Sequence, residues 1–263
     1  MYGQSLSQLQ LSSMRWVAGR PLPAWGYRIL RRYLAVFGYP SVAAHLLHPL
    51  ALKLLDIQPA DCLLDAGCGK ALLTTDSRVA SCRRYFAVDA VPGRVSHARH
   101  LGSELAVRAG FAAMDIAALA FSSAIFDKAI CLEVIEHIPN DQRGLDELFR
   151  VLRPGGRLVL STAETNHAVS LSVEVRHRDH VRTGYTRAAL EAKVIAAGFQ
   201  LERSMDLCGP RATWALSVEN AFVGRGLAFV LPFLFPFLWL IARHDEATEH
   251  VHQGQLLVAV RPE

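Results

Sequence analysis

Short apolar runs of strand length alternate with stretches of helical pattern over most of this chain. We expect strands at 62–65, 85–89, 110–114, 128–132, 157–161, 199–205 and 255–260, with helices at 70–79, 93–101, 141–152 and 186–197. Parallel strands that are buried on both faces read as continuous apolar runs, and they need long crossover connections, which are usually helices. The pattern therefore predicts an α/β fold with a seven-stranded, mostly parallel sheet and helices on both faces.

Composition supports a buried core and excludes some function classes. Apolar residues make up 51% of the chain and charged residues 20%, which argues against disorder. The formal net charge of +4 does not by itself argue for nucleic-acid binding, because no basic stripe is interleaved with stacking aromatics. The five cysteines are odd in number and contain no C-x-x-C pair, so we expect reduced thiols in a cytoplasmic setting. The beginning of the sequence does not have the pattern of a signal peptide.

A glycine-containing turn follows the first expected strand. The sequence Leu-Leu-Asp-Ala-Gly-Cys-Gly at 63–69 joins this strand to a helical stretch. Glycine is needed where backbone approaches a ligand closely, because a Cβ atom would collide with it. Asp89 ends the next strand, and a carboxylate there can accept hydrogen bonds from both ribose hydroxyls of a nucleoside. The turn therefore indicates a nucleoside cofactor site.

This turn resembles motif I of class I S-adenosylmethionine (SAM) dependent methyltransferases, D-x-G-C-G-x-G, except that Ala71 replaces the last glycine. Four further matches follow in order, at 88–89, 113–116, 126–133 and 152–158, the last resembling the family's L-x-P-G-G-x-L turn. The chain most resembles the ubiquinone-pathway and "methyltransferase type 11" group, which implies a Rossmann-like fold and SAM as cofactor. The resemblance implies these cofactor-binding residues: Asp65, Ala66, Gly67, Cys68 and Gly69 in the turn, Asp89 and Ala90 at the ribose, Asp115 and Ile116 at the adenine, and Glu133 at the cofactor edge.

A nicotinamide-binding fold is the alternative for such a turn. It requires G-x-G-x-x-G, with a pyrophosphate at the helix N-terminus. Leu72 occupies the position of the third glycine. SAM has no pyrophosphate, and an acidic residue before the glycines suits its ammonium group and sulfonium charge.

The segment after the fourth expected strand contains Glu133, Glu136 and His137. It resembles the E-x-x-E-H-I/V signature of many small-molecule methyltransferases. Three roles stay open. The residues organise the loop, His137 acts as general base towards a substrate hydroxyl, or they bind a divalent metal together with a distant histidine such as His180, as a related arrangement does in RNA 3′-end methyltransferases. The metal requirement is therefore unknown.

A polar run at 177–186 follows the fifth strand, where the family often carries a histidine and R-x-x-Y-T/S. His180 is accordingly a second candidate for the catalytic base or for a substrate contact, and Arg182, Tyr185 and Thr186 match the second pattern. The alternative is a solvated loop in which Thr186 caps the next helix.

Two segments suggest an apolar partner. Residues 1–55 contain no acidic residue and mix arginines with aromatic residues, and residues 226–242 are uncharged and rich in Leu and Phe. The latter are short for a membrane span, and Pro232 and Pro236 would interrupt a helix. A single crossing would also prevent the last strand from joining the sheet. We therefore expect peripheral membrane contact through 226–242 and the basic N-terminus, with a cap buried on the domain or a dimer contact as alternatives.

These observations predict one SAM-methyltransferase domain over 1–263. Its parts are a helical N-terminal lid at 1–56 with helices at 25–37 and 41–55, a cofactor-binding core at 57–207, an apolar insert at 208–253 and a last strand at 254–263. The expected reaction is methylation of a hydrophobic small-molecule or lipid-like acceptor, at oxygen, by a cytoplasmic enzyme with no nucleic-acid partner. The alternatives are a non-catalytic SAM- or lipid-binding protein and a metal-dependent methyltransferase that uses Glu133, Glu136 and His137.

Overall fold

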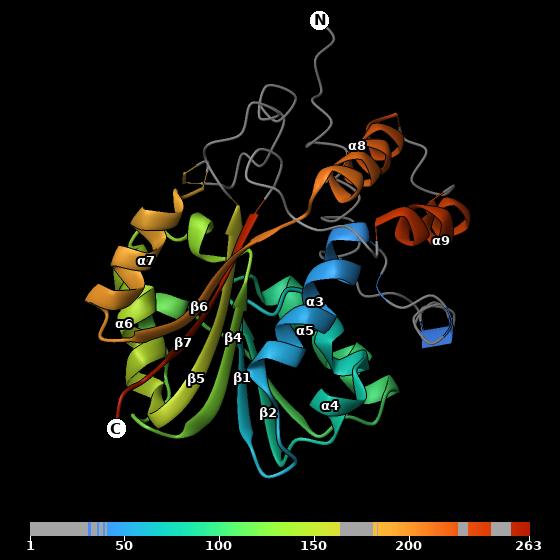
Figure 1. Ribbon diagram of the computed structural model, residues 1–263. Helices are drawn as coiled ribbons and strands as arrows, with labels where there is room; N and C mark the ends of the chain where they lie inside the picture. The colour runs from blue at the N-terminus through green and yellow to red at the C-terminus, as the bar shows by residue number, and fades with distance from the viewer. Residues whose placement is uncertain are drawn as a thin grey trace, which may run out of the picture.

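A seven-stranded sheet forms the centre of the computed structural model (Figure 1). The structure describes residues 41–163, 184–225, 231–242 and 254–263, together with 31, 32, 36, 39, 181 and 182. The strand order is β3-β2-β1-β4-β5-β7-β6. The strands are β1 Cys62–Ala66, β2 Arg84–Asp89, β3 Ala109–Ala113, β4 Phe126–Leu132, β5 Leu152–Ala163, β6 Gln200–Leu207 and β7 Gly254–Val260. The first five pair in parallel, whereas β7 is antiparallel to both β5 and β6, which confirms the mostly parallel sheet.

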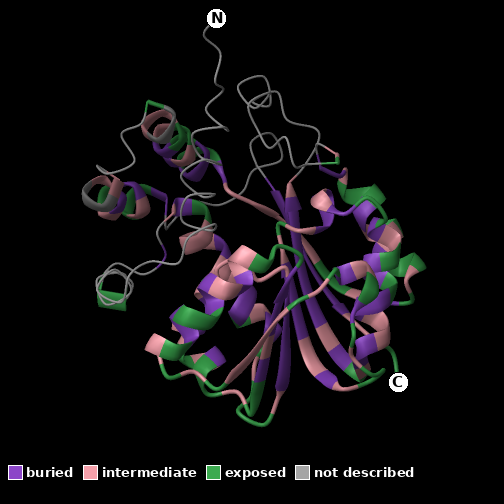
Figure 2. Ribbon diagram, turned by 180° about the vertical axis from the view of Figure 1, so that it is seen from behind, coloured by how far each residue is buried: buried purple, intermediate pink, exposed green. Residues whose placement is uncertain are grey.

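Helices cover both faces of this sheet (Figure 1). They are α3 Val42–Leu55, α4 Ser77–Ala80 and α5 Pro92–Glu104 on one face, and α6 Asp141–Val151 and α7 Arg187–Ala196 on the other. The strands are buried along most of their length, and the helices turn their buried sides to the sheet (Figure 2). The sheet therefore separates two apolar cores, as the alternating sequence pattern predicts.

Most predicted elements are confirmed, and the helix expected at 70–79 is wrong. A short 3₁₀ helix, η1 Leu72–Thr75, and the four-residue α4 replace it. Ala71 adopts a left-handed conformation with φ of 53°, and Asp76 is extended and caps α4 by accepting from the Arg78 backbone N–H. Two residues with non-helical backbone conformations thus interrupt a stretch whose sequence pattern is helical. The helix expected at 25–37 lies largely outside the described residues.

The described residues of the apolar insert form two helices, α8 Pro210–Gly224 and α9 Leu231–Ala242. Pro236 lies inside α9, so our expectation that the prolines interrupt this segment is wrong for 231–242. Pro232 stands in the first turn, where a proline removes no helical hydrogen bond, and Pro236 removes one bond only. Among the described residues, no helix is long and apolar enough to cross a membrane.

Helices α8 and α9 pack together on the beginning of α3. Their shared small core contains Val42, Ala212, Ala215, Phe235 and Leu238. The buried carboxylate of Glu219 on α8 accepts a hydrogen bond of 2.9 Å from the Val42 backbone N–H. Burial raises the pKa of Glu219 to about 7, against the opposing effect of this hydrogen bond. We refer to α8 and α9 together as the cap.

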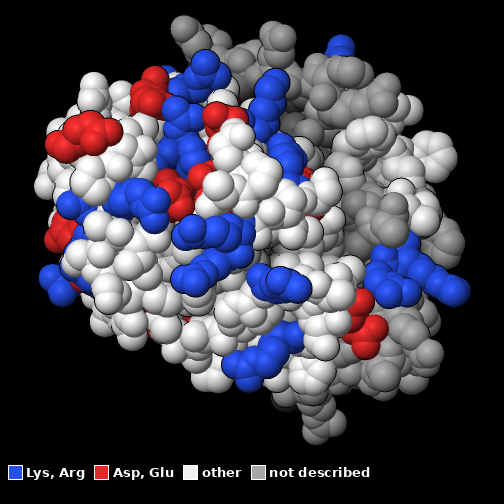
Figure 3. Space-filling view, turned by 90° about the horizontal axis from the view of Figure 1, so that it is seen from below, with Lys and Arg blue, Asp and Glu red and all other residues white. Residues whose placement is uncertain are grey.

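The cap lies at the end of the molecule towards which β5 points (Figure 1). Figure 3 views the molecule from the opposite end, where basic and acidic side chains are interspersed. In the sheet, β1 lies between β2 and β4. The chain adds β2 and β3 on one side of β1 and then crosses back to add β4 and β5 on the other side. In open α/β sheets, ligands bind beyond the carboxyl ends of the strands at such a switch point.

Candidate active site

The glycine loop after β1 is packed closely on one side and open on the other. At Gly67, with φ of 81°, an added Cβ would lie 2.3 Å from Cγ2 of Val134. The backbone N–H groups of Gly67 and Cys68 both donate to the Val88 carbonyl at 2.8 Å. At Gly69, with φ of 55°, no heavy atom lies within 4 Å of an added Cβ. The loop therefore offers exposed backbone that a ligand can approach closely.

Asp65, at the end of β1, is only 5% exposed. The Tyr85 hydroxyl on β2 donates a hydrogen bond of 2.5 Å to its Oδ2. Burial raises the pKa of Asp65 to about 7; the hydrogen bond opposes this shift and the charge of Asp89 adds to it. A cationic ligand group nearby would favour the ionised form. Sequence reasoning did not find Tyr85, since a tyrosine in an apolar strand is indistinguishable from a core residue.

Asp89 organises the loop from the end of β2. Its Oδ2 accepts from the Gly69 backbone N–H at 3.0 Å, and its Oδ1 accepts from the Val91 backbone N–H at 2.8 Å. Nη1 of Arg94 lies 3.7 Å from Oδ2. Because each carboxylate oxygen can accept more than one hydrogen bond, this arrangement leaves acceptor capacity for ribose hydroxyls. The neighbouring Ala90 is exposed.

Asp115 follows the end of β3, beside Asp89. The Met114 backbone N–H donates to the Asp89 carbonyl at 3.1 Å, which ties the two strand ends together. Asp115 is exposed, and its Oδ1 accepts from the Ala117 backbone N–H at the start of the 3₁₀ helix η2 Ile116–Ala118. Ile116 is buried at 6% exposure. Three acidic residues thus lie at or just after the ends of three adjacent strands, and their carboxylates form a set of acceptors that fits a nucleoside cofactor with a cationic tail.

The two glutamates after β4 are held by β5. Glu133 is exposed, has a left-handed φ of 55°, and its Oε1 accepts from the Ser161 hydroxyl at 2.8 Å. Glu136 is 1% exposed, and its Oε2 accepts from the Thr162 hydroxyl at 3.0 Å. Burial raises the pKa of Glu136, and the hydrogen bond from Thr162 opposes the shift. Strained backbone of the kind at Glu133 concentrates at functional sites.

His137 ends the 3₁₀ helix η3 Ile135–His137 and is half-buried. Its backbone N–H donates to the Val134 carbonyl at 2.9 Å, so the histidine lies one turn after the residue that packs against Gly67. Within the described residues, no group of three His, Cys, Asp or Glu side chains could hold a metal ion. Glu133, Glu136 and His137 therefore do not form a metal site by themselves. His180 lies outside the described residues.

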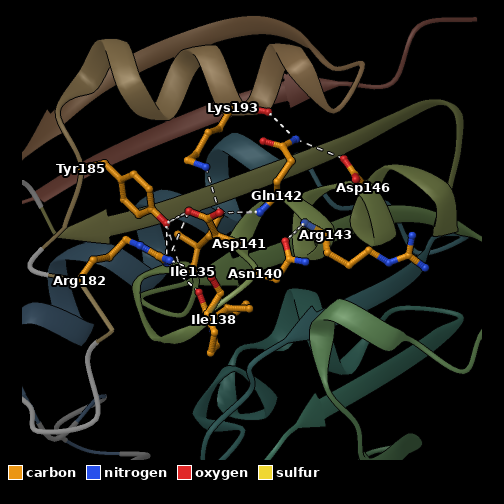
Figure 4. A network of polar contacts seen from close by, with 11 residues as sticks. Ile135, Ile138, Asn140, Asp141, Gln142, Arg143, Asp146, Arg182, Tyr185 and Lys193 are labelled. Atoms are coloured by element: carbon orange, nitrogen blue, oxygen red, sulfur yellow. Dashed lines mark hydrogen bonds and ion pairs between the residues drawn. The ribbon is translucent and has the colours of Figure 1, made fainter.

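An ionic network fixes the segment after β4 from the other side (Figure 4). Nη1 of Arg182 donates to the carbonyls of Ile135 at 3.0 Å and Ile138 at 2.8 Å, and to the Tyr185 hydroxyl at 3.0 Å. The Tyr185 hydroxyl donates to Oδ2 of Asp141 at 2.6 Å. The R-x-x-Y pattern therefore holds the η3 segment in place. Thr186 accepts from the Ala189 backbone N–H and caps α7.

Asp141 is the centre of this network, and sequence reasoning missed it. Nζ of Lys193 on α7 donates to its Oδ1 at 2.9 Å, and Nη1 of Arg182 lies 3.5 Å from its Oδ2. Burial acts to raise the pKa of Asp141, but the hydrogen bonds from Tyr185 and Lys193 and the charge of Arg182 outweigh it and lower that pKa. An acidic residue at a helix start reads from sequence as an ordinary cap, which conceals this role.

An aromatic cluster links the cap to the segment after the glycine loop. Tyr39 is 6% exposed, and burial together with the charge of Asp76, the residue after η1, raises the pKa of the Tyr39 hydroxyl to about 12. The centroid of the Tyr39 ring lies 4.5 Å from that of His48, and the two rings are arranged edge to face. The ring of His45 lies 5.4 Å from that of Trp239 on α9. His45 of α3 thus links Trp239 to Tyr39, whose carbonyl oxygen lies 3.3 Å from the His45 Nδ1, and α3 itself shares a core with Ala71 and Leu73, which follow the glycine loop.

Comparisons with known proteins agree with this site. The family model described as "Methyltransferase domain" matches residues 64–160, which run from β1 to β5. A ubiquinone biosynthesis O-methyltransferase of Xanthomonas oryzae pv. oryzae is 34% identical over 140 residues, 51% of this chain and 58% of that protein. The chain thus spans somewhat more than half the length of this relative. The enzyme of the same name from Xanthomonas axonopodis pv. citri is 30% identical over 62% of this chain and 74% of its own length.

Solved structures show the same fold. The [4+2]-cyclase SpnF aligns with a TM-score of 0.58 at 20% identity, covering 82% of this chain and 80% of that chain. The geranyl diphosphate C-methyltransferase of Streptomyces coelicolor A3(2), solved with Mg²⁺, geranyl diphosphate and S-adenosyl-L-homocysteine, aligns with a TM-score of 0.59 at 15% identity, covering 81% and 77%. The strand order, the acidic residues and glycines beyond β1 to β3, and these relatives lead to one conclusion. The chain belongs to the Rossmann-like, class I SAM-dependent methyltransferases, and SAM is its cofactor.

Proposed function

We propose that this protein transfers the methyl group of SAM to an oxygen of a hydrophobic, lipid-like small molecule. The observation that carries the proposal is the packing of the apolar cap on α3, the helix whose other buried residues share a core with Ala71 and Leu73 just after the cofactor loop. The curated relatives named as ubiquinone biosynthesis O-methyltransferases support an acceptor that combines a hydroxyl group with an apolar body.

The residues expected to hold the cofactor come from three adjacent strand ends. Asp89 would bind the ribose hydroxyls, Asp115 and Ile116 would hold the adenine, and the open side at Gly69 would admit the cofactor to the backbone. Asp65 would face its ammonium group, with Ala66, Cys68 and Ala90 completing the loop and Glu133 at its edge. Bound SAM supplies a methyl group that its sulfonium already activates. The protein's part is to align the acceptor, exclude water and remove a proton.

His137 is our candidate for the base that takes this proton. It lies in η3, which follows β4 at the switch point of the sheet. Arg182 fixes this turn by donating hydrogen bonds to the carbonyls of Ile135 and Ile138. Imidazole titrates near neutral pH and so suits the transfer. His180 is the alternative base.

Two other functions compete with this proposal. The alignment with a [4+2]-cyclase illustrates that one fold carries different chemistry, so a binding protein without transfer activity is one alternative. A metal-dependent transfer is the other, and it would need a ligand beyond Glu133, Glu136 and His137.

Methyl transfer from radiolabelled SAM to a catechol with a short isoprenoid tail, beside the tail-less catechol, tests the proposal. We expect turnover of the tailed acceptor with a lower KM. His137→Gln should lower kcat at least about 100-fold without changing the affinity for S-adenosylhomocysteine. His100→Gln, on the exposed side of α5, is the matched control and should change neither value.

Each alternative gives a different result in this assay. If His180→Gln lost activity and His137→Gln did not, His180 would be the catalytic base. Turnover that requires added magnesium would favour the metal-dependent reaction. Cofactor binding without turnover of any hydroxylated acceptor would favour the binding protein.

A further inference from the structure

The outer side of the cap exposes a concentration of large apolar side chains. Eight such side chains are exposed among the described residues, and four of them lie on α8 and α9: Trp214 at 54%, Phe237 at 67%, Leu240 at 52% and Ile241 at 41%. The family model ends at residue 160, so the common methyltransferase core does not account for these two helices.

Helical geometry places these residues opposite the cap's own core. On α9, Phe237 is followed at i+3 and i+4 by Leu240 and Ile241, a spacing that forms one face. Phe235 and Leu238 belong to the core shared with α3. On α8, Ala212 and Ala215 are buried whereas Trp214 is exposed. The two helices therefore turn apolar side chains both towards α3 and away from it.

The charged residues of α8 are also divided between the outer side of the cap and the side that faces α3. Arg211 and Arg225 are exposed at the two ends of α8. With 3.6 residues per turn, both arginines lie on the side of α8 that carries Trp214, Arg211 within one turn of it and Arg225 about 16 Å further along the axis. The single acidic residue of the two described helices, Glu219, is buried and accepts from the Val42 backbone N–H. Among the residues of α8 and α9 that the structure describes, the outer side of the cap is thus apolar and carries positive charge only.

We propose that this outer side docks onto the surface of an anionic phospholipid membrane. Exposed Phe, Leu and Ile side chains beside arginines and a tryptophan suit the boundary between acyl chains and negatively charged headgroups. A second copy of the chain is a poorer partner, because a two-fold contact would place like faces together. The arginines of both copies would then meet without an acidic residue from either cap. This docking does not depend on methyl transfer, although it would bring the proposed lipid-like acceptor within reach.

Flotation with vesicles tests the docking, using full-length protein with phosphatidylglycerol–phosphatidylcholine vesicles or with phosphatidylcholine alone. Wild type should bind the anionic vesicles, and added salt should weaken the binding. The double variant Phe237→Ser/Leu240→Ser should bind at least about tenfold more weakly. Arg211→Gln/Arg225→Gln should bind more weakly and lose most of its salt dependence.

Ile195→Ser is the matched control, because Ile195 is 56% exposed on α7, away from the cap. It should bind vesicles as wild type does. Each variant's midpoint of thermal unfolding should match that of wild type, which shows that the fold is retained.

Three results would overturn the proposal. The first is wild type that does not bind the anionic vesicles, and the second is a Phe237→Ser/Leu240→Ser variant that binds like wild type. The third is a wild-type dimer in solution that this variant converts to monomer. The last result would assign the outer side to a second copy of the chain. Cofactor affinity is measured separately by calorimetry, so failure of docking is distinguishable from failure of the proposed function.

Discussion

After β1, backbone conformation shapes the site: Gly67 and Ala71 have left-handed φ values of 81° and 53°, and backbone N–H groups bind Asp89. After β4, side chains from distant segments shape it. Glu136 is held by Thr162 of β5, and η3 is held by Arg182. The contacts of Asp89 with the glycine loop span at most 20 positions, whereas those that hold Glu136 and η3 span 26 and 47 positions. The first side therefore shows as a short motif in the sequence, whereas the contacts of the second are visible only in the folded protein.

Gly67→Ala should have the largest effect, because Gly67 is where the two sides touch. The new Cβ would lie 2.3 Å from Cγ2 of Val134, at a φ that alanine rarely adopts. We expect a loss of about 3 kcal/mol in stability and at least about 100-fold in affinity for S-adenosylhomocysteine, measured by thermal unfolding and calorimetry.

Gly69→Ala is its matched control within the same loop. It has a left-handed φ of 55° but no heavy atom within 4 Å of the added Cβ, so only about 1 kcal/mol of strain is expected. A stable Gly69→Ala protein that still loses the cofactor would show that the ligand occupies the open side. Equal stability loss in both variants would contradict the contact between the two sides.

Asp141→Asn should affect the side after β4. Removing the charge that Lys193 and Arg182 face should reduce the free energy of unfolding at neutral pH by about 2 kcal/mol. Because the folded-state pKa of Asp141 is lowered, its contribution is present above the unfolded pKa and is lost as pH falls through the folded value. Denaturant unfolding at neutral and acidic pH should show the two proteins converging in acid, and at each pH both proteins should bind S-adenosylhomocysteine with the same affinity.

The pH dependence of cofactor affinity tests the role of Asp65, whose pKa in the folded protein is raised to about 7. The ammonium group of the cofactor favours the carboxylate, so affinity should rise with pH. Between about pH 6 and pH 8 we expect about a tenfold gain, measured by calorimetry with S-adenosylhomocysteine. In Asp65→Asn this dependence should disappear. If the affinity of wild type for S-adenosylhomocysteine did not change with pH, Asp65 would not be the residue that faces the ammonium group.

Ala71→Gly should have the smallest effect. Glycine relieves the left-handed strain at φ of 53° but adds freedom to the unfolded chain, so we expect a net gain of only about 0.5 kcal/mol in thermal stability. Ala71→Val should instead destabilise the protein, because a β-branched residue tolerates this conformation poorly. If valine were accepted without cost, the backbone account of the loop would fail.

The sequence allowed prediction of the strands and the cofactor loop because both follow local rules. Apolar runs specify buried parallel strands, and the position of glycines beside Asp65 and Asp89 specifies a ligand turn. It failed for the helix at 70–79, where an alanine takes the left-handed conformation usual for glycine. It also missed the Asp141 network, and it offered a cap buried on the domain only as an alternative, without identifying α3 as its partner. Lys193 lies 52 positions from Asp141, and no local pattern relates them.

Calorimetric titration with S-adenosylhomocysteine, comparing wild type with Asp89→Ala, tests the central claim most directly. Asp89 binds the backbone of the glycine loop through both carboxylate oxygens, and it is the residue proposed to bind the ribose. We predict micromolar binding by wild type and no measurable binding by the variant, whose retained fold is checked by circular dichroism. A well-folded wild type that does not bind the ligand, or a variant that binds it equally well, would contradict the account.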